Sequence, residues 1–226
     1  MRFFAAVALL CVLASSNAIA QAPYDFRGAK LGMMLDEFRT LPFPDPVSHL
    51  LGSEWTATVT LVCTGDKKIS GYDPTAVSSA DRAVGAIDCL WMIPPDGVGY
   101  PRWTPATIRV GDFGSIGVIY SFMPTAEGSP ALRQILVRLS ARVFASVVTA
   151  LTQRFGEPAK TEAAEVQNGF GNKFPSANIT WENDASTLYV VERSGEVSQM
   201  ALLYTHKALD TQYRAALEAT KGPPKI

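Results

Sequence analysis

The chain has 226 residues, with 20 lysines and arginines against 21 aspartates and glutamates and a formal net charge of −1. Because the basic residues neither outnumber the acidic ones nor cluster, the composition argues against nucleic-acid binding and against attachment to anionic lipid. A chain of this length can bury a core as one large domain or two small ones.

Residues 1–20 have the organisation of an export signal. Arg2 precedes an apolar run from Phe3 to Ala14, and residues 18–20, Ala-Ile-Ala, match a small-residue cleavage site. The run is too short to cross a bilayer core of ~30 Å as a helix. We therefore expect a cleaved signal peptide, a mature chain that begins near Gln21, a periplasmic location and no membrane span.

Residues 26–41, FRGAKLGMMLDEFRTL, predict an extended lead-in followed by a short helix. Leu35, Phe38 and Leu41 fall close to one helical face, and the prolines that follow stop the helix. Asp36 and Glu37 are adjacent, and adjacent residues on a helix do not face each other, so the pair suits the helix N-terminus better than catalysis.

The cysteines downstream of the leader, Cys63 and Cys89, predict one disulfide. In segments 56–63 and 86–93, alternating apolar residues put each cysteine on the apolar face of a strand. An even pair in an exported chain is usually oxidised, and no C-x-x-C motif indicates a redox role. The alternative is two buried free thiols.

A loop rich in proline and glycine, residues 93–105, follows the second cysteine strand, and a polar excursion, residues 64–85, precedes that strand. Tyr100, Arg102 and Trp103 in the loop are the candidate partner-contact residues. Aromatic side chains on a proline-stiffened loop supply contact area at low entropic cost. The alternative is a loop that folds over the sheet to close the core.

The next segment predicts a hairpin whose strands, residues 107–110 and 115–123, are joined by a Gly-Asp-Phe-Gly turn. Ile116, Val118, Tyr120 and Phe122 share one face of its second strand. Residues 123–130 are the expected boundary in the chain. The predicted organisation is therefore a first half at 21–125, a second half at 131–220 and a tail at 221–226.

The second half begins with a strand at 132–140 that places Ile135, Val137 and Leu139 on one face. A helix follows, which starts after Ser140 and stops at Gly156. The remaining pattern predicts three strands, at residues 177–183, 186–192 and 197–205. A last amphipathic helix uses Leu209, Tyr213 and Leu217. Each half thus has a lead strand, one helix and antiparallel strands. This order predicts an α+β fold, with helices packed on antiparallel sheet and a duplicated β-α-β-β-β unit.

Few residues suggest chemistry. His49 and His206 have no second ligand at metal-binding spacing, and the chain lacks a G-x-S-x-G elbow. Glu162 and Glu165 are expected in a solvent-exposed loop rather than across a glycosidase cleft. Residues 168–174, NGFGNKF, lack the spacing of a phosphate-binding loop and predict a flexible hairpin-like loop. We expect no catalytic residues, no metal site and no cofactor.

Residues 26–38 resemble the signature F-(K/R)-G-x-x-L-G-M-(S/T)-x-x-E-(F/V), found at the start of many uncharacterised small exported bacterial proteins. Part of this signature is also similar to the outer-membrane-assembly lipoprotein family and to the β-lactamase-inhibitor-protein-like fold. The resemblance implies an exported module of helices on a small antiparallel sheet that binds other proteins, and it transfers no catalytic residues. Met34 stands where the signature has Ser or Thr, so a hydroxyl helix cap is missing.

These observations predict an exported periplasmic module that binds or scaffolds an envelope protein. Two alternatives stay open. One is a periplasmic hydrolase that uses scattered acids beside the loop at 93–105. The other is a protein that binds a small molecule, lipid or peptide in a cleft between its halves.

Overall fold

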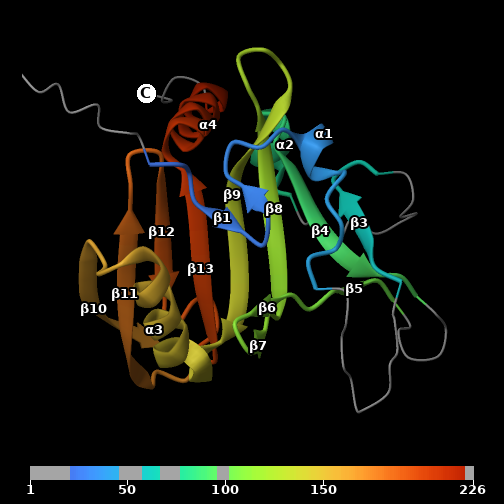
Figure 1. Cartoon of the computed structure of the whole chain (residues 1–226). Helices are drawn as coiled ribbons and strands as arrows, with labels where there is room; N and C mark the ends of the chain where they lie inside the picture. Colours follow the sequence, from blue (N-terminus) through green and yellow to red (C-terminus); the bar gives the residue numbers. More distant parts are fainter. Residues whose placement is uncertain (1–20, 46–57, 67–76, 96–101, 222–226) are drawn as a thin grey trace, which may run out of the picture.

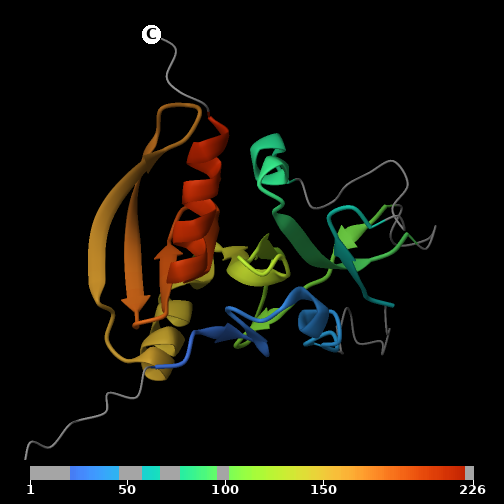
Figure 2. The same ribbon diagram turned by 90° about the horizontal axis from the view of Figure 1, so that it is seen from above.

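The computed structural model describes residues 21–45, 58–66, 77–95 and 102–221. They form an α+β structure in which one antiparallel sheet carries helices on both faces (Figures 1 and 2). The expected signal peptide lies outside the described residues. No described helix is long and apolar enough to cross a membrane.

Nine of the described strands form the main sheet. Eight of them run from edge to edge in the order β10-β11-β12-β13-β9-β8-β4-β3, and β5 pairs with one end of β4. Their bounds are β3 Thr60–Cys63, β4 Ile87–Ile93, β5 Thr104–Pro105, β8 Gly117–Pro124, β9 Pro130–Ser140, β10 Lys160–Gln167, β11 Lys173–Glu182, β12 Ser186–Val191 and β13 Gln199–His206.

The expected boundary between the halves coincides with the turn that joins β8 to β9. These strands pair along their whole length, from Gly117 opposite Arg138 to Pro124 opposite Pro130. The turn is closed by a hydrogen bond from the Thr125 N–H to the Ser129 carbonyl, 3.1 Å. Both halves therefore contribute strands to the same sheet, with the seam at its centre.

One face of the sheet carries the main core. Its side chains alternate along the strands as the sequence predicts: Ile135, Val137 and Leu139 of β9 are fully buried, as is Phe122 of β8. Ile116, expected on the same face, lies before β8 and is 51% exposed. Two helices cover this face, α1 at Leu35–Phe38 and α3 at Phe144–Phe155, together with two small hairpins (Figure 2).

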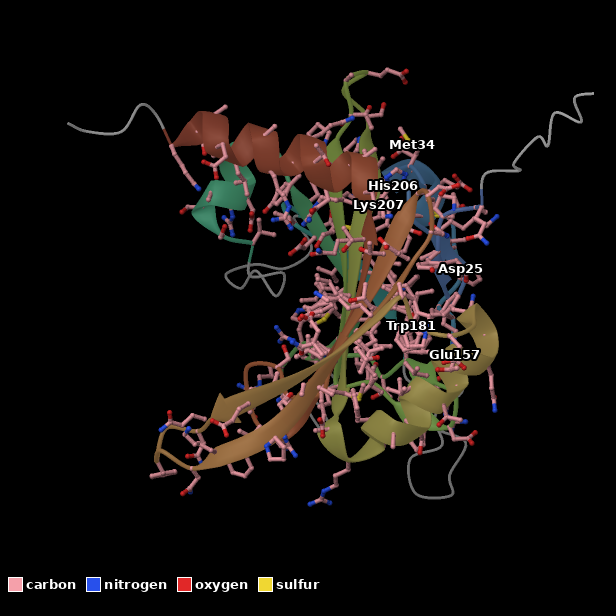
Figure 3. All side chains as sticks on the ribbon, turned by 90° about the vertical axis from the view of Figure 1, so that its left-hand side faces the viewer. Asp25, Met34, Glu157, Trp181, His206 and Lys207 are labelled. Carbon is pink, nitrogen blue, oxygen red and sulfur yellow. A yellow bond between two sulfur atoms is a disulfide. The ribbon has the colours of Figure 1, made fainter. Side chains whose placement is uncertain are left out.

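Helix α3 confirms the helix predicted after Ser140. A short 3₁₀ turn, η1 at Ala141–Val143, comes first, and the Ser140 hydroxyl accepts a hydrogen bond from the Arg142 N–H. At the other end, the Trp181 indole donates to the carbonyl of Gly156, 2.8 Å away. Figure 3 shows Trp181 beside this end of the helix. The helix is thus fixed to β11 by its C-terminal carbonyl.

The opening stretch forms a tight hairpin, β1 at Asp25–Phe26 and β2 at Ala29–Lys30, and then the single-turn helix α1. The helix ends at Phe38, earlier than the predicted Leu41. Met34 is its N-cap and makes no side-chain cap bond, as expected from the missing hydroxyl. The segment is instead held by the sheet, since Leu132 exchanges backbone hydrogen bonds of 2.8 Å with Gly32 and Met33.

The other face of the sheet carries α4 at Lys207–Thr220 and α2 at Ser79–Ala83 (Figure 2). Leu209 of α4 packs on Met123 and Ala131 at the ends of β8 and β9. Helix α2 lies within the predicted polar excursion, where Ser78 caps it by accepting from the Asp81 N–H.

One predicted strand pairing and one predicted loop are wrong. The strand expected at 107–110 forms β6 at Arg109–Val110, which pairs with β7 at Phe113–Gly114 in a separate small sheet, while β8 pairs with β4 and β9. Glu162 and Glu165, expected in a loop, lie on the strand β10. This strand is exposed almost throughout, so it lacks the alternation that marks a half-buried strand.

Candidate functional site

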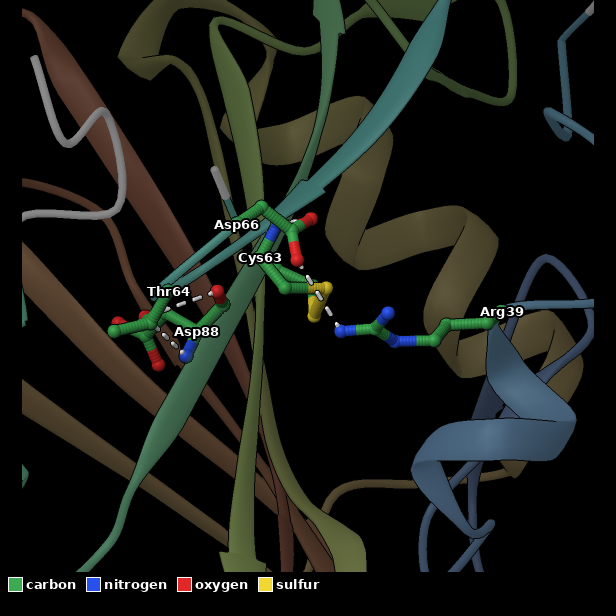
Figure 4. The surroundings of a disulfide bond; sticks show 6 residues. Arg39, Cys63, Thr64, Asp66 and Asp88 are labelled. Atoms are coloured by element: carbon green, nitrogen blue, oxygen red, sulfur yellow. Dashed lines mark hydrogen bonds and ion pairs between the residues drawn. A yellow bond between two sulfur atoms is a disulfide. The ribbon is translucent and has the colours of Figure 1, made fainter. Parts of the chain in front are cut away.

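The predicted disulfide is present and closes one edge of the sheet. Cys63 and Cys89 face each other directly on β3 and β4, with an S–S distance of 2.02 Å, and both are buried in the main core. Asp66 accepts from the Cys63 N–H at 3.0 Å and pairs with Arg39 after α1 at 3.5 Å (Figure 4). The disulfide therefore has a structural role: it joins β3 to β4, and Asp66 connects this edge to the segment after α1.

The predicted partner-contact loop is only partly described. Tyr100 lies outside the described residues, and Arg102 is exposed. Trp103 is half-buried and packs on the small apolar cluster of Val62, Leu90 and Met92. Trp103 thus contributes to packing on this face, which leaves Arg102 as the exposed member of the described pair.

His206 caps the last helix. Its Nδ1 accepts a hydrogen bond from the Leu209 N–H at 3.4 Å, at the start of α4. Burial lowers the pKa of His206, so the neutral ring that can accept this bond is favoured. His49 lies outside the described residues. In the described ranges, no group of three or more His, Cys, Asp or Glu residues could hold a metal ion.

A cluster of charges joins α2, α4 and β9. The Tyr213 hydroxyl donates to Asp81, and the buried Arg133 stacks on the Tyr213 ring at 3.8 Å and binds Asp210 at 2.7 Å. Burial of Asp81 opposes its charge, but hydrogen bonds from Tyr213 and Ser78 outweigh this and lower its pKa. Burial and Asp81 together raise the pKa of Tyr213 to about 12. Because its charges are paired, the cluster fastens helices rather than offering a reactive group.

The hairpin of β10 and β11 presents the most exposed aromatic residue of the described chain. Phe170, at its tip, is 93% exposed. Figure 3 shows this hairpin projecting from the body of the molecule. Sequence reasoning placed residues 168–174 in a hairpin-like loop; residues 168–172 form the turn, whereas Lys173 already begins β11. It gave Phe170 no role. A lone aromatic between two glycines was the available signal.

The turn that carries Phe170 is held by its own hydrogen bonds. The Asn168 side-chain carbonyl accepts from the N–H groups of Phe170 and Asn172, at 3.0 and 2.9 Å. The Asn168 backbone bonds to Asn172 and Gly171, each at 3.0 Å. Gly171 has φ +85°, a left-handed conformation that glycine adopts without strain. The loop expected to be flexible is therefore a turn with a hydrogen-bonded backbone at Phe170.

β10 is the outer strand of the sheet beside this tip. It pairs with β11 along eight residues without a bulge, and in the described chain no strand pairs with its other side. Glu162 and Glu165, expected in a loop, lie on this strand and form exposed ion pairs with Lys160 and Lys173, at 2.9 and 2.8 Å. The acids are thus neutralised at the surface and do not flank a cleft.

The hairpin thus combines an exposed aromatic side chain on a hydrogen-bonded turn, an outer strand edge that no described strand pairs, and exposed ion pairs. Comparison of the chain with models of protein families, with curated proteins and with solved structures finds no match.

Proposed function

We propose that the chain is an exported binding protein that contacts another protein through the β10–β11 hairpin. The observation that carries this proposal is Phe170, 93% exposed on a turn closed by four hydrogen bonds. Exposed aromatic side chains on an ordered backbone are typical anchors of protein interfaces.

The magnitudes favour a protein partner over a bilayer. Burial of one phenylalanine contributes about 1.5 to 3 kcal/mol, which is too little for stable membrane attachment by a single side chain. The charges around the tip are balanced, with Lys173 paired to Glu165, so the hairpin carries no basic cluster for anionic lipid. In a protein interface, the burial of Phe170 adds to the contacts that neighbouring residues make with the same partner.

The free edge of β10 supplies such neighbours. An extended segment of a partner can add to an exposed strand and form backbone hydrogen bonds along it. Ala163 and Ala164 at the middle of β10 leave room for this approach. The charged residues on both sides of these alanines disfavour non-specific pairing of this edge with strands of other chains.

The rest of the proposal follows from the sequence. The leader at 1–20 supports export, and a disulfide is the usual covalent brace of exported proteins. The periplasm is the location that we propose, and an envelope protein is the proposed partner. We also propose that the halves are repeats, because each places one helix, α1 or α3, on the same face of the sheet.

A photo-reactive benzoylphenylalanine in place of Phe170 tests the contact in intact cells that export the chain. We expect one dominant cross-linked protein, identified by mass spectrometry. The same residue in place of Glu127, an exposed side chain in the β8–β9 turn, is the matched control and should capture no such protein. No reproducible product from position 170, or the same product from both positions, would reject the hairpin as the contact site.

A further inference from the structure

A pocket lies where segments of the two halves meet on the main core face. The turn between β1 and β2 and the turn between β6 and β7 form one side of it, and α3 with β13 forms the other. Its volume is about 440 Å³, which is in the range of sites for small molecules. The pocket shares no residue with the β10–β11 hairpin, so it is a second candidate site.

Part of the wall of this pocket is apolar. Phe26, Val147 and Leu151 contribute to its wall, are almost fully buried and belong to the main hydrophobic core. The wall is thus fixed by core packing rather than by mobile side chains. A ligand that fills the pocket must present an apolar body to these residues.

Tyr204 is the buried polar residue of this wall. It is 2% exposed, and its ring packs on Phe26 with 5.8 Å between ring centroids. Its hydroxyl makes no hydrogen bond within the described part of the chain, and this oxygen is not fully shielded from solvent. Burial raises the pKa of Tyr204, so the hydroxyl stays protonated and can donate. This orphaned donor at the pocket surface is available to an acceptor on a ligand.

Three arginines surround the pocket, and two of them already have carboxylate partners. Arg154 pairs with Asp25 at 2.9 Å, and Arg109 pairs with Asp45 at 3.9 Å. Arg27 differs: its Nε donates to the Arg109 carbonyl at 2.9 Å, and no described carboxylate lies within ion-pair distance. Its terminal nitrogens therefore remain available to an anion.

The backbone of Arg27 supports a role for its side chain. Arg27 has φ +53°, the only described residue other than glycine in the left-handed region. With Gly28 at φ +89°, it forms the two-residue turn between β1 and β2, a position where Asn or Gly is preferred. The turn requires this conformation at both residues, and it sets the position of the Arg27 side chain at the pocket.

We propose that this pocket binds a small molecule with an apolar body and a singly charged anionic head group. Arg27 binds the head group, and the Tyr204 hydroxyl donates a hydrogen bond to it. A single charge fits because Asp25 and Asp45 balance the other two arginines. The exposed carboxylate of Asp112, also at the rim, disfavours a second negative charge.

Binding to the mature chain can be measured by calorimetry, with NMR shifts of the residues around the pocket as the site readout. The probes are octanoate, octyl phosphate, octylamine and octanol, which share one apolar chain and differ in head group. We expect octanoate to bind about tenfold more tightly than octanol or octylamine, because a charge-assisted hydrogen bond to arginine is lost without the anion. We also expect octanoate to bind more tightly than octyl phosphate, because the second negative charge of the phosphate is disfavoured by Asp112; the reverse order would contradict a singly charged head group.

Two variants assign the roles. Arg27→Gln should weaken octanoate binding about tenfold and leave octanol binding unchanged. Arg138→Gln is the matched control, because Arg138 is exposed on the opposite face of β9, and it should change neither affinity. Tyr204→Phe removes only the orphaned hydroxyl, so octanoate binding should fall about threefold while the melting temperature is equal or higher.

Equal binding of octanol and octanoate, or no shifts around the pocket with any of the probes, would overturn the proposal. A lower melting temperature for Tyr204→Phe would also contradict it, since the hydroxyl would then have a structural partner. None of these outcomes bears on the contact proposed for Phe170, which the cross-linking experiment tests separately.

Discussion

The two edges of the sheet are built in opposite ways. At one edge, β3 has four residues, its last two side chains are buried, and a disulfide joins it to β4. At the other edge, β10 has eight residues, is exposed almost throughout and leads to Phe170. An edge that only completes a fold is short and fastened, so the long, open edge with an aromatic tip is the one suited to a partner.

Removal of the disulfide should have the largest effect on stability. The bridge closes a loop with a sequence separation of 26 residues, and its loss should lower the free energy of unfolding by roughly 3.5 kcal/mol. Urea unfolding of a variant with Cys63→Ala and Cys89→Ala measures this loss. Reductant should destabilise the parent chain and leave the variant unchanged. A loss below about 1 kcal/mol would show that β3 does not depend on its covalent brace.

The same substitution in the interior and at the open edge sharpens the contrast. Val137 of β9 is fully buried, whereas Val166 of β10 is half-exposed. Val137→Ala should lower the free energy of unfolding by about 2 to 3 kcal/mol, because it removes buried methyl groups and leaves a cavity. Val166→Ala should cost less than about 1 kcal/mol. Equal losses in urea unfolding would mean that β10 is not a free edge.

The cap of α4, next to the central strand β13, should make stability depend on pH. The pKa of His206 is lowered in the folded chain, below the ordinary value of 6.5. Below pH 6.5 the unfolded chain therefore binds more protons, and the free energy of unfolding should fall as the pH falls through the folded pKa.

The loss from this one group should reach about 1 kcal/mol, as for other helix caps. His206→Asn keeps a cap without titration in this range, so the stability difference between the two chains should be constant above pH 6.5 and change below it. Parallel pH profiles of the parent and the variant would contradict the assigned role.

Phe170→Ala should have the smallest effect on stability. The side chain is 93% exposed, so its truncation should change the free energy of unfolding by less than about 0.5 kcal/mol. Thermal unfolding checks this expectation. A clear drop in the melting temperature would show that Phe170 packs on the protein itself and would remove the reason to assign it a partner.

The interior of the fold could be predicted from the sequence because burial of one strand face leaves an alternating pattern of apolar residues. Ile135, Val137 and Leu139 alternate with less buried neighbours, and Ser140 and Gly156 mark the limits of the helix region. Alternation arises only where one face of a strand is buried, so β10 could not be found by this signal. Alternation also does not specify the partner of a strand, which is why the small β6–β7 hairpin was assigned wrongly.

The sites were harder to predict, since they depend on which segments meet. The cysteine pair was predicted because both cysteines lie on apolar strand faces. Arg27, Tyr204 and α3 are far apart in the chain, and only the sheet brings them around one pocket. Phe170 is visible in the sequence, but its exposure depends on the Asn168 hydrogen bonds that shape the turn.

The central claim is that Phe170 anchors a partner protein, and affinity tests it most directly. Once the protein cross-linked at position 170 is identified, its affinity for the mature chain can be compared by calorimetry with its affinity for the Phe170→Ala variant. We predict at least a tenfold weaker affinity for the variant at an unchanged melting temperature, as expected for an anchor residue. Equal affinities of the two chains would contradict the account.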